Sequence, residues 1–173
     1  MKNAILSAAL FAALTISCST QKDVNKVIID PDLNKEILIG KVNENGLNNE
    51  DVFTNTKLYY DIYKVDTELA KAIKSNSKGI SVKVIFGSWC GDSKINVPAF
   101  QKIVDVSEFN ISKVEYIAVN RKKGGGSVDI TNLKVTYVPT FIFYRKKKEI
   151  GRIVEYPKSK TIEQDWVDIV TKQ

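Results

Sequence analysis

Short apolar runs and longer periodic apolar stretches succeed one another along this chain and predict its secondary structure. Short runs rich in β-branched side chains are typical of strands, and they lie at 37–42, 82–86, 114–119, 140–144 and 150–154. Apolar residues that recur every three or four positions are typical of helices that bury one face, and they occupy 54–75, 92–109 and the segment after Thr161. This order predicts an α/β fold in which a mixed β-sheet carries helices on both faces.

Polar segments separate these elements and limit the expected domain. Residues 121–132 are polar and rich in glycine, which predicts a loop, and residues 145–149 predict the turn of a β-hairpin. Residues 18–36 are mostly polar and predict a tether, in which only 27–29 has the character of a short edge strand. The folded domain is therefore expected to span 37–173.

The first seventeen residues have the organisation of a secretory signal peptide. A basic start at residues 1–3 precedes thirteen almost entirely apolar residues, 4–16, and the small residue Ser17. Thirteen residues rise only about 20 Å as a helix, less than the roughly 30 Å hydrocarbon core of a bilayer. Residues 1–17 are therefore predicted to be a signal peptide and not a transmembrane helix.

The end of this segment, Leu14-Thr15-Ile16-Ser17-Cys18, resembles the lipobox of bacterial lipoproteins, with Thr15 where that motif usually has leucine. The resemblance implies cleavage before Cys18 and attachment of lipid to its sulfur. It also implies a lipid-anchored protein of the cell envelope, facing the periplasm or the outer membrane. The alternative is an ordinary signal peptide, which would leave Cys18 as a free thiol.

Composition excludes several kinds of active site. The chain has no histidine, so it has no Ser-His-Asp or Cys-His machinery and no histidine zinc ligand. Its two cysteines cannot form a zinc site of four thiolates. The net charge of +6 is modest and spread along the chain, which does not indicate nucleic acid. We therefore expect no metal, no cofactor and no nucleic-acid partner.

The chemistry is concentrated at Trp89-Cys90-Gly91-Asp92-Ser93, where a predicted buried strand ends and a helix begins. The first N–H groups of a helix lack partners and its dipole is positive there, so a thiolate of Cys90 would be stabilised. Asp92 opposes this effect because it brings a second negative charge close. Cys90 is therefore the candidate nucleophile.

At this motif the chain resembles the thioredoxin family, whose active site is Trp-Cys-Gly-x-Cys. Pro98 matches the helix proline of that family, and Val138-Pro139-Thr140 matches its cis-proline loop. The resemblance covers 37–173 and implies a three-layer thioredoxin-like fold with Pro139 in the cis form. It also implies that Trp89 and the Val138-Pro139-Thr140 segment bind the substrate, with the Val138 backbone beside the thiol.

Two departures from the family pattern bear on activity. Ser93 stands where the family has its second, resolving cysteine, and Val84 stands where many members bury a carboxylate. The resemblance therefore implies thiol–disulfide exchange through Cys90 alone, with protein or peptide thiols and disulfides as partners and an external thiol to release the product. Ser93 would either donate a hydrogen bond to the Cys90 thiolate or cap the helix.

The sequence is also compatible with other functions. The groove beside Pro139 could bind extended peptides without any reaction at the thiol, or Cys90 could sense peroxide as a sulfenic acid. Of two basic clusters, Arg121-Lys122-Lys123 should lie at the active-site edge of the sheet and could attract an acidic substrate or a lipid headgroup. The second cluster, 145–148, should lie at the opposite edge and is interpreted as a solvated turn.

Overall fold

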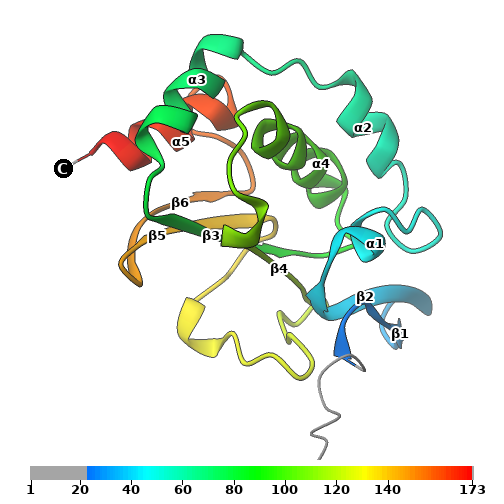
Figure 1. Ribbon diagram of the computed structural model, residues 1–173. Helices are drawn as coiled ribbons and strands as arrows, with labels where there is room; N and C mark the ends of the chain where they lie inside the picture. The colour runs from blue at the N-terminus through cyan, green and yellow to red at the C-terminus, as the bar shows by residue number, and fades with distance from the viewer. Residues whose placement is uncertain (1–22, 173) are drawn as a thin grey trace, which may run out of the picture.

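The computed structural model describes residues 23–172 and shows a six-stranded sheet in the order β1-β2-β4-β3-β5-β6 (Figure 1). The strands are β1 (Lys26–Asp30), β2 (Lys35–Val42), β3 (Ile80–Phe86), β4 (Val114–Ala118), β5 (Thr140–Arg145) and β6 (Lys148–Val154). β3 and β4 are parallel, and every other neighbouring pair is antiparallel. The predicted α/β fold with a mixed sheet is therefore confirmed, and β3 is a central strand that ends just before the Cys90 motif.

The sheet begins earlier in the chain than the sequence predicts. β1 pairs with β2 from Lys26 opposite Ile39 to Asp30 opposite Lys35, so residues 26–36 form an edge hairpin and not a tether. The weak strand signal at 27–29 marks this edge strand. The expected signal peptide and Cys18 lie outside the described residues.

The helices are α1 (Glu44–Leu47), α2 (Thr56–Ile62), α3 (Thr67–Asn76), α4 (Gly91–Val106) and α5 (Ile162–Thr171). The single helix predicted over 54–75 is therefore two, because Asp66 starts a new one. Its side chain accepts hydrogen bonds from the backbone N–H groups of Glu68 and Leu69, as an N-cap residue does. The apolar periodicity continues through this break, which hides it in the sequence.

The helices pack over one face of the sheet, where the larger core lies (Figure 1). The ring of Trp166 on α5 stacks on Phe100 of α4 at 5.1 Å, and Phe100 stacks on Phe141 of β5 at 4.8 Å. These contacts fix α4, and hence its N-terminus, against the centre of the sheet. No helix among residues 23–172 is long and apolar enough to cross a membrane.

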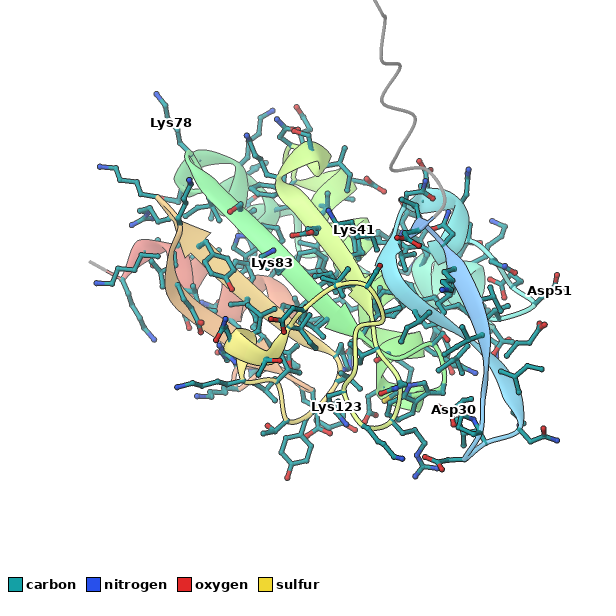
Figure 2. All side chains as sticks on the ribbon, turned by 90° about the horizontal axis from the view of Figure 1, so that it is seen from below. Asp30, Lys41, Asp51, Lys78, Lys83 and Lys123 are labelled. Atoms are coloured by element: carbon teal, nitrogen blue, oxygen red, sulfur yellow. The ribbon has the colours of Figure 1, made fainter. Side chains whose placement is uncertain are left out.

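The opposite face is covered mainly by the segment between β4 and β5, and not by an α-helix as expected. Residues 119–138 cross this face as a loop with one 3-10 turn, η3 (Thr131–Leu133), and bury a smaller apolar cluster that includes Ile85, Ile117 and Ile142. Figure 2 shows this loop over the strands, with Lys123 on it. Its polar, glycine-rich sequence explains the absence of a longer helix here.

The remaining predicted features of the C-terminal half are present. Lys146 and Lys147, at φ 51° and 66°, form the two-residue turn of the β5–β6 hairpin, as type I′ geometry requires. Thr161 caps α5 by accepting a hydrogen bond from the Gln164 N–H. The Gln164 side chain bonds Asp168 instead of completing the capping box.

Candidate functional site

Cys90 is the N-cap residue of α4 and lies where β3 turns into that helix. The Cys90 N–H donates to the carbonyl of Gly87 at 2.9 Å, which closes the turn. The thiol is partly exposed and is not in a disulfide. It makes no capping hydrogen bond to the helix and points instead to the backbone carbonyl of Val138, at 3.2 Å from Sγ to O. The sulfur therefore lies between a helix N-terminus and a peptide carbonyl.

The Val138–Pro139 bond is cis, as the resemblance implies. Two hydrogen bonds hold the chain around it: Glu155 N–H donates to the Pro139 carbonyl at 2.8 Å, and the Thr140 hydroxyl donates to the Tyr137 carbonyl at 2.7 Å. Val138, Pro139 and Thr140 are all buried and thus form a fixed support next to Cys90, although they are 48 or more residues away along the chain.

Ser93 occupies neither of the two roles expected for it. Its side chain is fully buried, at 0% exposure, and its hydroxyl accepts a hydrogen bond from the Gly87 N–H at 3.2 Å. The bond ties the first turn of α4 to the end of β3. Ser93 is therefore a positioning residue of the β3–α4 turn, three residues after Cys90 along the chain.

Trp89 is fixed beside the thiol and joins it to the basic cluster. Its indole Nε1 donates to the Val119 carbonyl at 2.8 Å. The Lys123 ammonium lies 5.5 Å and the Arg121 guanidinium 6.0 Å from the centre of its ring, within the range of cation–π attraction. The predicted location of this cluster at the active-site edge is confirmed, and two cations lie next to Trp89.

The indole ring of Trp89 packs close to the β3–α4 turn, since a Cβ atom at Gly87 would lie only 2.6 Å from the ring. Glycine at this position thus lets the indole approach the backbone.

Sequence analysis missed Tyr156 as part of this site. The Tyr156 hydroxyl donates to a carboxylate oxygen of Asp92 at 2.5 Å, and this hydrogen bond raises the pKa of Tyr156. The loop that carries Tyr156 is held to α4 by a bond from the Asn96 side chain to the Glu155 carbonyl at 3.0 Å. No local pattern could have revealed a pair that is 64 residues apart.

The arrangement offers thiol chemistry. The family's carboxylate position is the fully buried Val84 on β3, so no acid lies there. Among residues 23–172, no group of three or more Cys, Asp or Glu side chains could hold a metal ion. The groups that meet at the site are one thiol, a helix N-terminus, a peptide carbonyl and an aromatic ring flanked by cations.

Comparisons with known proteins identify the family of this chain. A sequence model of the family described as thioredoxin matches residues 44–167. Among solved structures, thioredoxin from Fasciola hepatica is 26% identical, with 50% of this chain and 78% of that chain covered and a TM-score of 0.34. Oxidised mitochondrial thioredoxin 3 from Saccharomyces cerevisiae is 24% identical, with coverage of 56% and 85% and a TM-score of 0.33.

A protein of unknown function from Pseudomonas aeruginosa is 14% identical, with coverage of 60% of this chain and a TM-score of 0.45. This chain spans 63% of the length of that protein. A search of curated proteins gave no match.

The family match covers the β3–α4 junction, both prolines of the resemblance and most of α5. Since it includes more than half of the chain, the assignment does not depend on the individual structures. The chain belongs to the thioredoxin family.

Proposed function

We propose that this protein carries out thiol–disulfide exchange by a monothiol mechanism in which Cys90 is the only reacting side chain. The Cys90 thiolate attacks a substrate disulfide, so that a bond forms between Sγ and one substrate sulfur while the other sulfur leaves as a thiolate. An external thiolate then attacks the substrate sulfur of this mixed disulfide and expels Cys90 as a thiolate. The net result is exchange of one substrate thiol for the external thiol, and Cys90 is regenerated.

The observation that carries this proposal is the environment of the Cys90 sulfur. The thiol is partly exposed at the N-terminus of α4, and its hydrogen-bond partner is a backbone carbonyl of the Val138–Pro139 segment. An approaching disulfide can replace that carbonyl as the contact of the sulfur. Ser93 is buried and bonded to Gly87, and a serine hydroxyl cannot displace a sulfur from the mixed disulfide, so the second step needs a thiol from outside.

The substrates we propose are protein or peptide disulfides. Val138 is buried, but its backbone carbonyl lies against the thiol. An extended peptide that takes the place of the thiol at this carbonyl would pair with it by a main-chain hydrogen bond. Trp89 supplies an apolar surface next to the thiol. We further propose that the protein works at the cell envelope, anchored by lipid on Cys18. Mass spectrometry of the mature N-terminus tests that anchor, and an unmodified Cys18 would contradict it.

A peptide disulfide with a fluorescent leaving thiol, mixed with reduced glutathione as the external thiol, tests the exchange reaction. We expect the protein to accelerate release of the fluorescent thiol. The Cys90→Ser variant should fall to the uncatalysed rate, whereas Cys18→Ser, which removes the other cysteine, should retain activity. A protein that does not accelerate release, or a Cys90→Ser variant as active as the original, would refute the proposal.

A measurement of the affinity for the same peptide, made beside the rate measurement, separates catalysis from simple binding. If the protein binds the peptide equally well with and without the Cys90 thiol and accelerates nothing, a non-catalytic peptide-binding function replaces the proposed one.

A further inference from the structure

A second depression lies on the helix face of the sheet, between α1, β4 and the C-terminal half of α4. It has a volume of about 380 Å³. Leu47, Ile111 and Val114 contribute apolar walls, while Glu44 and Asp105 contribute carboxylates. Asp105 lies near the C-terminal end of α4, fifteen residues after Cys90, which caps the N-terminus of this helix; the separation corresponds to about 22 Å of helix axis. This cavity is therefore separate from the thiol site.

The cavity contains a buried hydroxyl that nothing in the described part of the chain satisfies. Tyr116 on β4 is 5% exposed and lines the cavity, and its Oη has no hydrogen-bond partner among residues 23–172. Buried polar groups in folded proteins are nearly always paired, so an unpaired one calls for an explanation. Burial and the nearby Asp105 charge raise the pKa of Tyr116, so its hydroxyl stays neutral.

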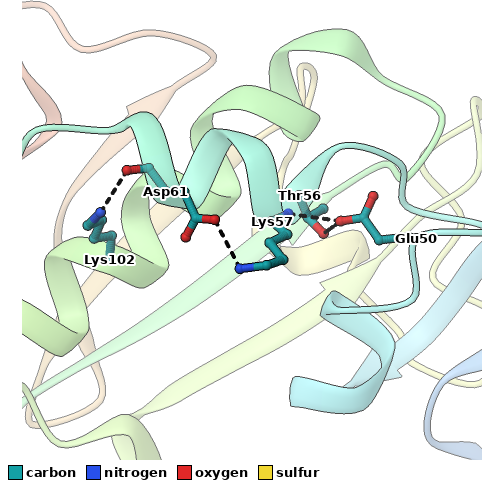
Figure 3. Close-up of polar contacts among 5 residues, drawn as sticks. All are labelled: Glu50, Thr56, Lys57, Asp61 and Lys102. Carbon is teal, nitrogen blue, oxygen red and sulfur yellow. Dashed lines mark hydrogen bonds and ion pairs between the residues drawn. The ribbon is translucent and has the colours of Figure 1, made fainter.

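The carboxylates around the cavity differ in how many hydrogen-bond and ion-pair partners they already have. A neighbouring hollow shares Glu44 and Asp105 with this cavity and is also lined by Glu50 and Asp61. Glu50 is used at the start of α2, where it accepts from the Thr56 hydroxyl and the Lys57 N–H. Asp61 is paired with the Lys57 ammonium at 2.9 Å, and Lys102 bonds its carbonyl (Figure 3).

Glu44 and Asp105 differ from these two acids. Neither takes part in an ion pair formed within residues 23–172. One oxygen of Asp105 accepts from the Tyr60 hydroxyl at 2.7 Å, which leaves its second oxygen for another donor. Two carboxylates and an unpaired hydroxyl thus line a cavity that also has apolar walls.

We propose that this cavity binds an alkylammonium group, meaning a primary ammonium on a short aliphatic stem. An ammonium has three N–H donors and no acceptor. The residues that line the cavity supply acceptors for these donors, among them the carboxylates of Glu44 and Asp105 and a lone pair of the Tyr116 hydroxyl. The stem would contact Leu47, Ile111 and Val114. An anion would be repelled by the two carboxylates. The ammonium can belong to a free amine or to a lysine side chain of a partner protein.

Titration of the ¹⁵N-labelled protein with 1-pentylammonium, followed by NMR, tests the site. We expect saturable shifts confined to residues 42–47, 101–105 and 111–116. A parallel titration with Nα-acetyl-lysine methylamide separates the two sources. Binding of pentylammonium alone indicates a free amine, and equal or tighter binding of the lysine derivative indicates a partner's side chain.

Two variants and one matched control make the test specific. Asp105→Asn should weaken binding about tenfold or more, because it removes a charge-assisted hydrogen bond. Tyr116→Phe, which keeps the packing of the ring, should weaken binding about threefold to tenfold. Asp61→Asn removes the same charge from an acid already paired with Lys57 and should change affinity less than twofold or so.

The absence of saturable shifts in the unaltered protein, or equal losses in Asp105→Asn and Asp61→Asn, would overturn the proposal. Neither result depends on the reactivity of Cys90.

Discussion

The Tyr156 hydroxyl lies 2.5 Å from a carboxylate oxygen of Asp92. Asp92 follows the nucleophile candidate Cys90 by two positions in the sequence. Asp92 is in the first turn of α4, where a carboxylate interacts favourably with the helix dipole but unfavourably with a neighbouring thiolate. A hydrogen bond from Tyr156 withdraws negative charge from this carboxylate. Tyr156 is thus in a position to weaken the repulsion between Asp92 and Cys90.

This relationship predicts opposite effects from two substitutions. Asp92→Asn should increase the rate at which Cys90 reacts with a neutral disulfide about twofold to fivefold, since unit charges 4 Å apart in water interact by about 1 kcal/mol. Tyr156→Phe should decrease that rate because the carboxylate loses its donor. Stopped-flow measurement at neutral pH checks both variants. Rate changes of the same sign would contradict this account of Tyr156.

The cations beside Trp89 predict a preference for acidic disulfides. Replacing Arg121 and Lys123 together by Gln should slow the reaction of Cys90 with oxidised glutathione about threefold to tenfold at low salt. The difference should shrink as salt increases, because the Debye length falls from about 10 Å at 0.1 M to about 3 Å at 1 M.

The matched control removes two charges from the opposite edge of the sheet. Replacing Lys146 and Lys147 by Gln makes the same change in net charge in the β5–β6 turn, which is not near the thiol. If this control slows the reaction as much as the Arg121 and Lys123 variant, overall charge is responsible and the local cluster is not.

The buried Ser93 predicts what a second thiol would do. In Ser93→Cys, the new thiol is one helical turn from Cys90, as in the two-cysteine sites of the family. It should attack the mixed disulfide, expel the bound substrate and leave an intramolecular disulfide between positions 90 and 93. Intact-mass analysis after reaction with a peptide disulfide should show no adduct and a loss of about 2 Da, whereas Ser93→Ala should keep the adduct.

Persistence of the adduct in Ser93→Cys would mean that position 93 cannot reach the mixed disulfide. The assignment of Ser93 to the resolving-cysteine position would then be wrong.

Much of the fold follows from local sequence, and the remainder depends on contacts between distant segments. The strand ending before Gly87 and the helix starting at Gly91 are predictable, because a β-branched run gives way to a turn and then to periodic apolar residues. The break at Asp66 is missed because apolar periodicity continues across it, even though Asp66 itself is a good N-cap residue. The β1 strand is indicated only weakly, at 27–29, because its pairing with β2 fixes its extent.

The candidate site divides in the same way. Cys90, Trp89 and Pro139 are identified by a compact motif and a family resemblance. Tyr156 is not, because only the fold of the β6–α5 connection brings it to Asp92. The unpaired hydroxyl of Tyr116 is likewise visible only in three dimensions, since the sequence of a strand does not tell whether a tyrosine finds a hydrogen-bond partner.

The hydrogen bond between Tyr60 and Asp105 predicts a pH dependence of stability. This bond, together with burial and the Asp105 charge, raises the pKa of Tyr60 to about 12. Because the pKa of Tyr60 is higher in the folded state, its hydroxyl contributes fully to stability at pH values below its unfolded pKa of about 10. This contribution is lost as the pH rises toward the folded pKa. Tyr60→Phe should therefore be less stable than the original protein at pH 8.

The free energies of unfolding of Tyr60→Phe and of the original protein should become more alike as the pH is raised above 10. Urea unfolding at several pH values between about 8 and 11.5 measures the difference. Both proteins lose stability at high pH as other tyrosines ionise, so the informative quantity is the gap between their free energies of unfolding. A gap that stays constant over this range would show that Tyr60 does not contribute through its protonated hydroxyl.

We propose, above all, that the sulfur of Cys90 is an accessible nucleophile in the folded protein. The most direct test is to mix the folded protein with a peptide disulfide, quench with acid, and locate the bound peptide by intact-mass analysis and peptide mapping. We predict one peptide per chain, bound to Cys90 through a disulfide, and no peptide bound at position 90 in the Cys90→Ser variant. Modification of Cys90 only after the protein is unfolded would contradict it.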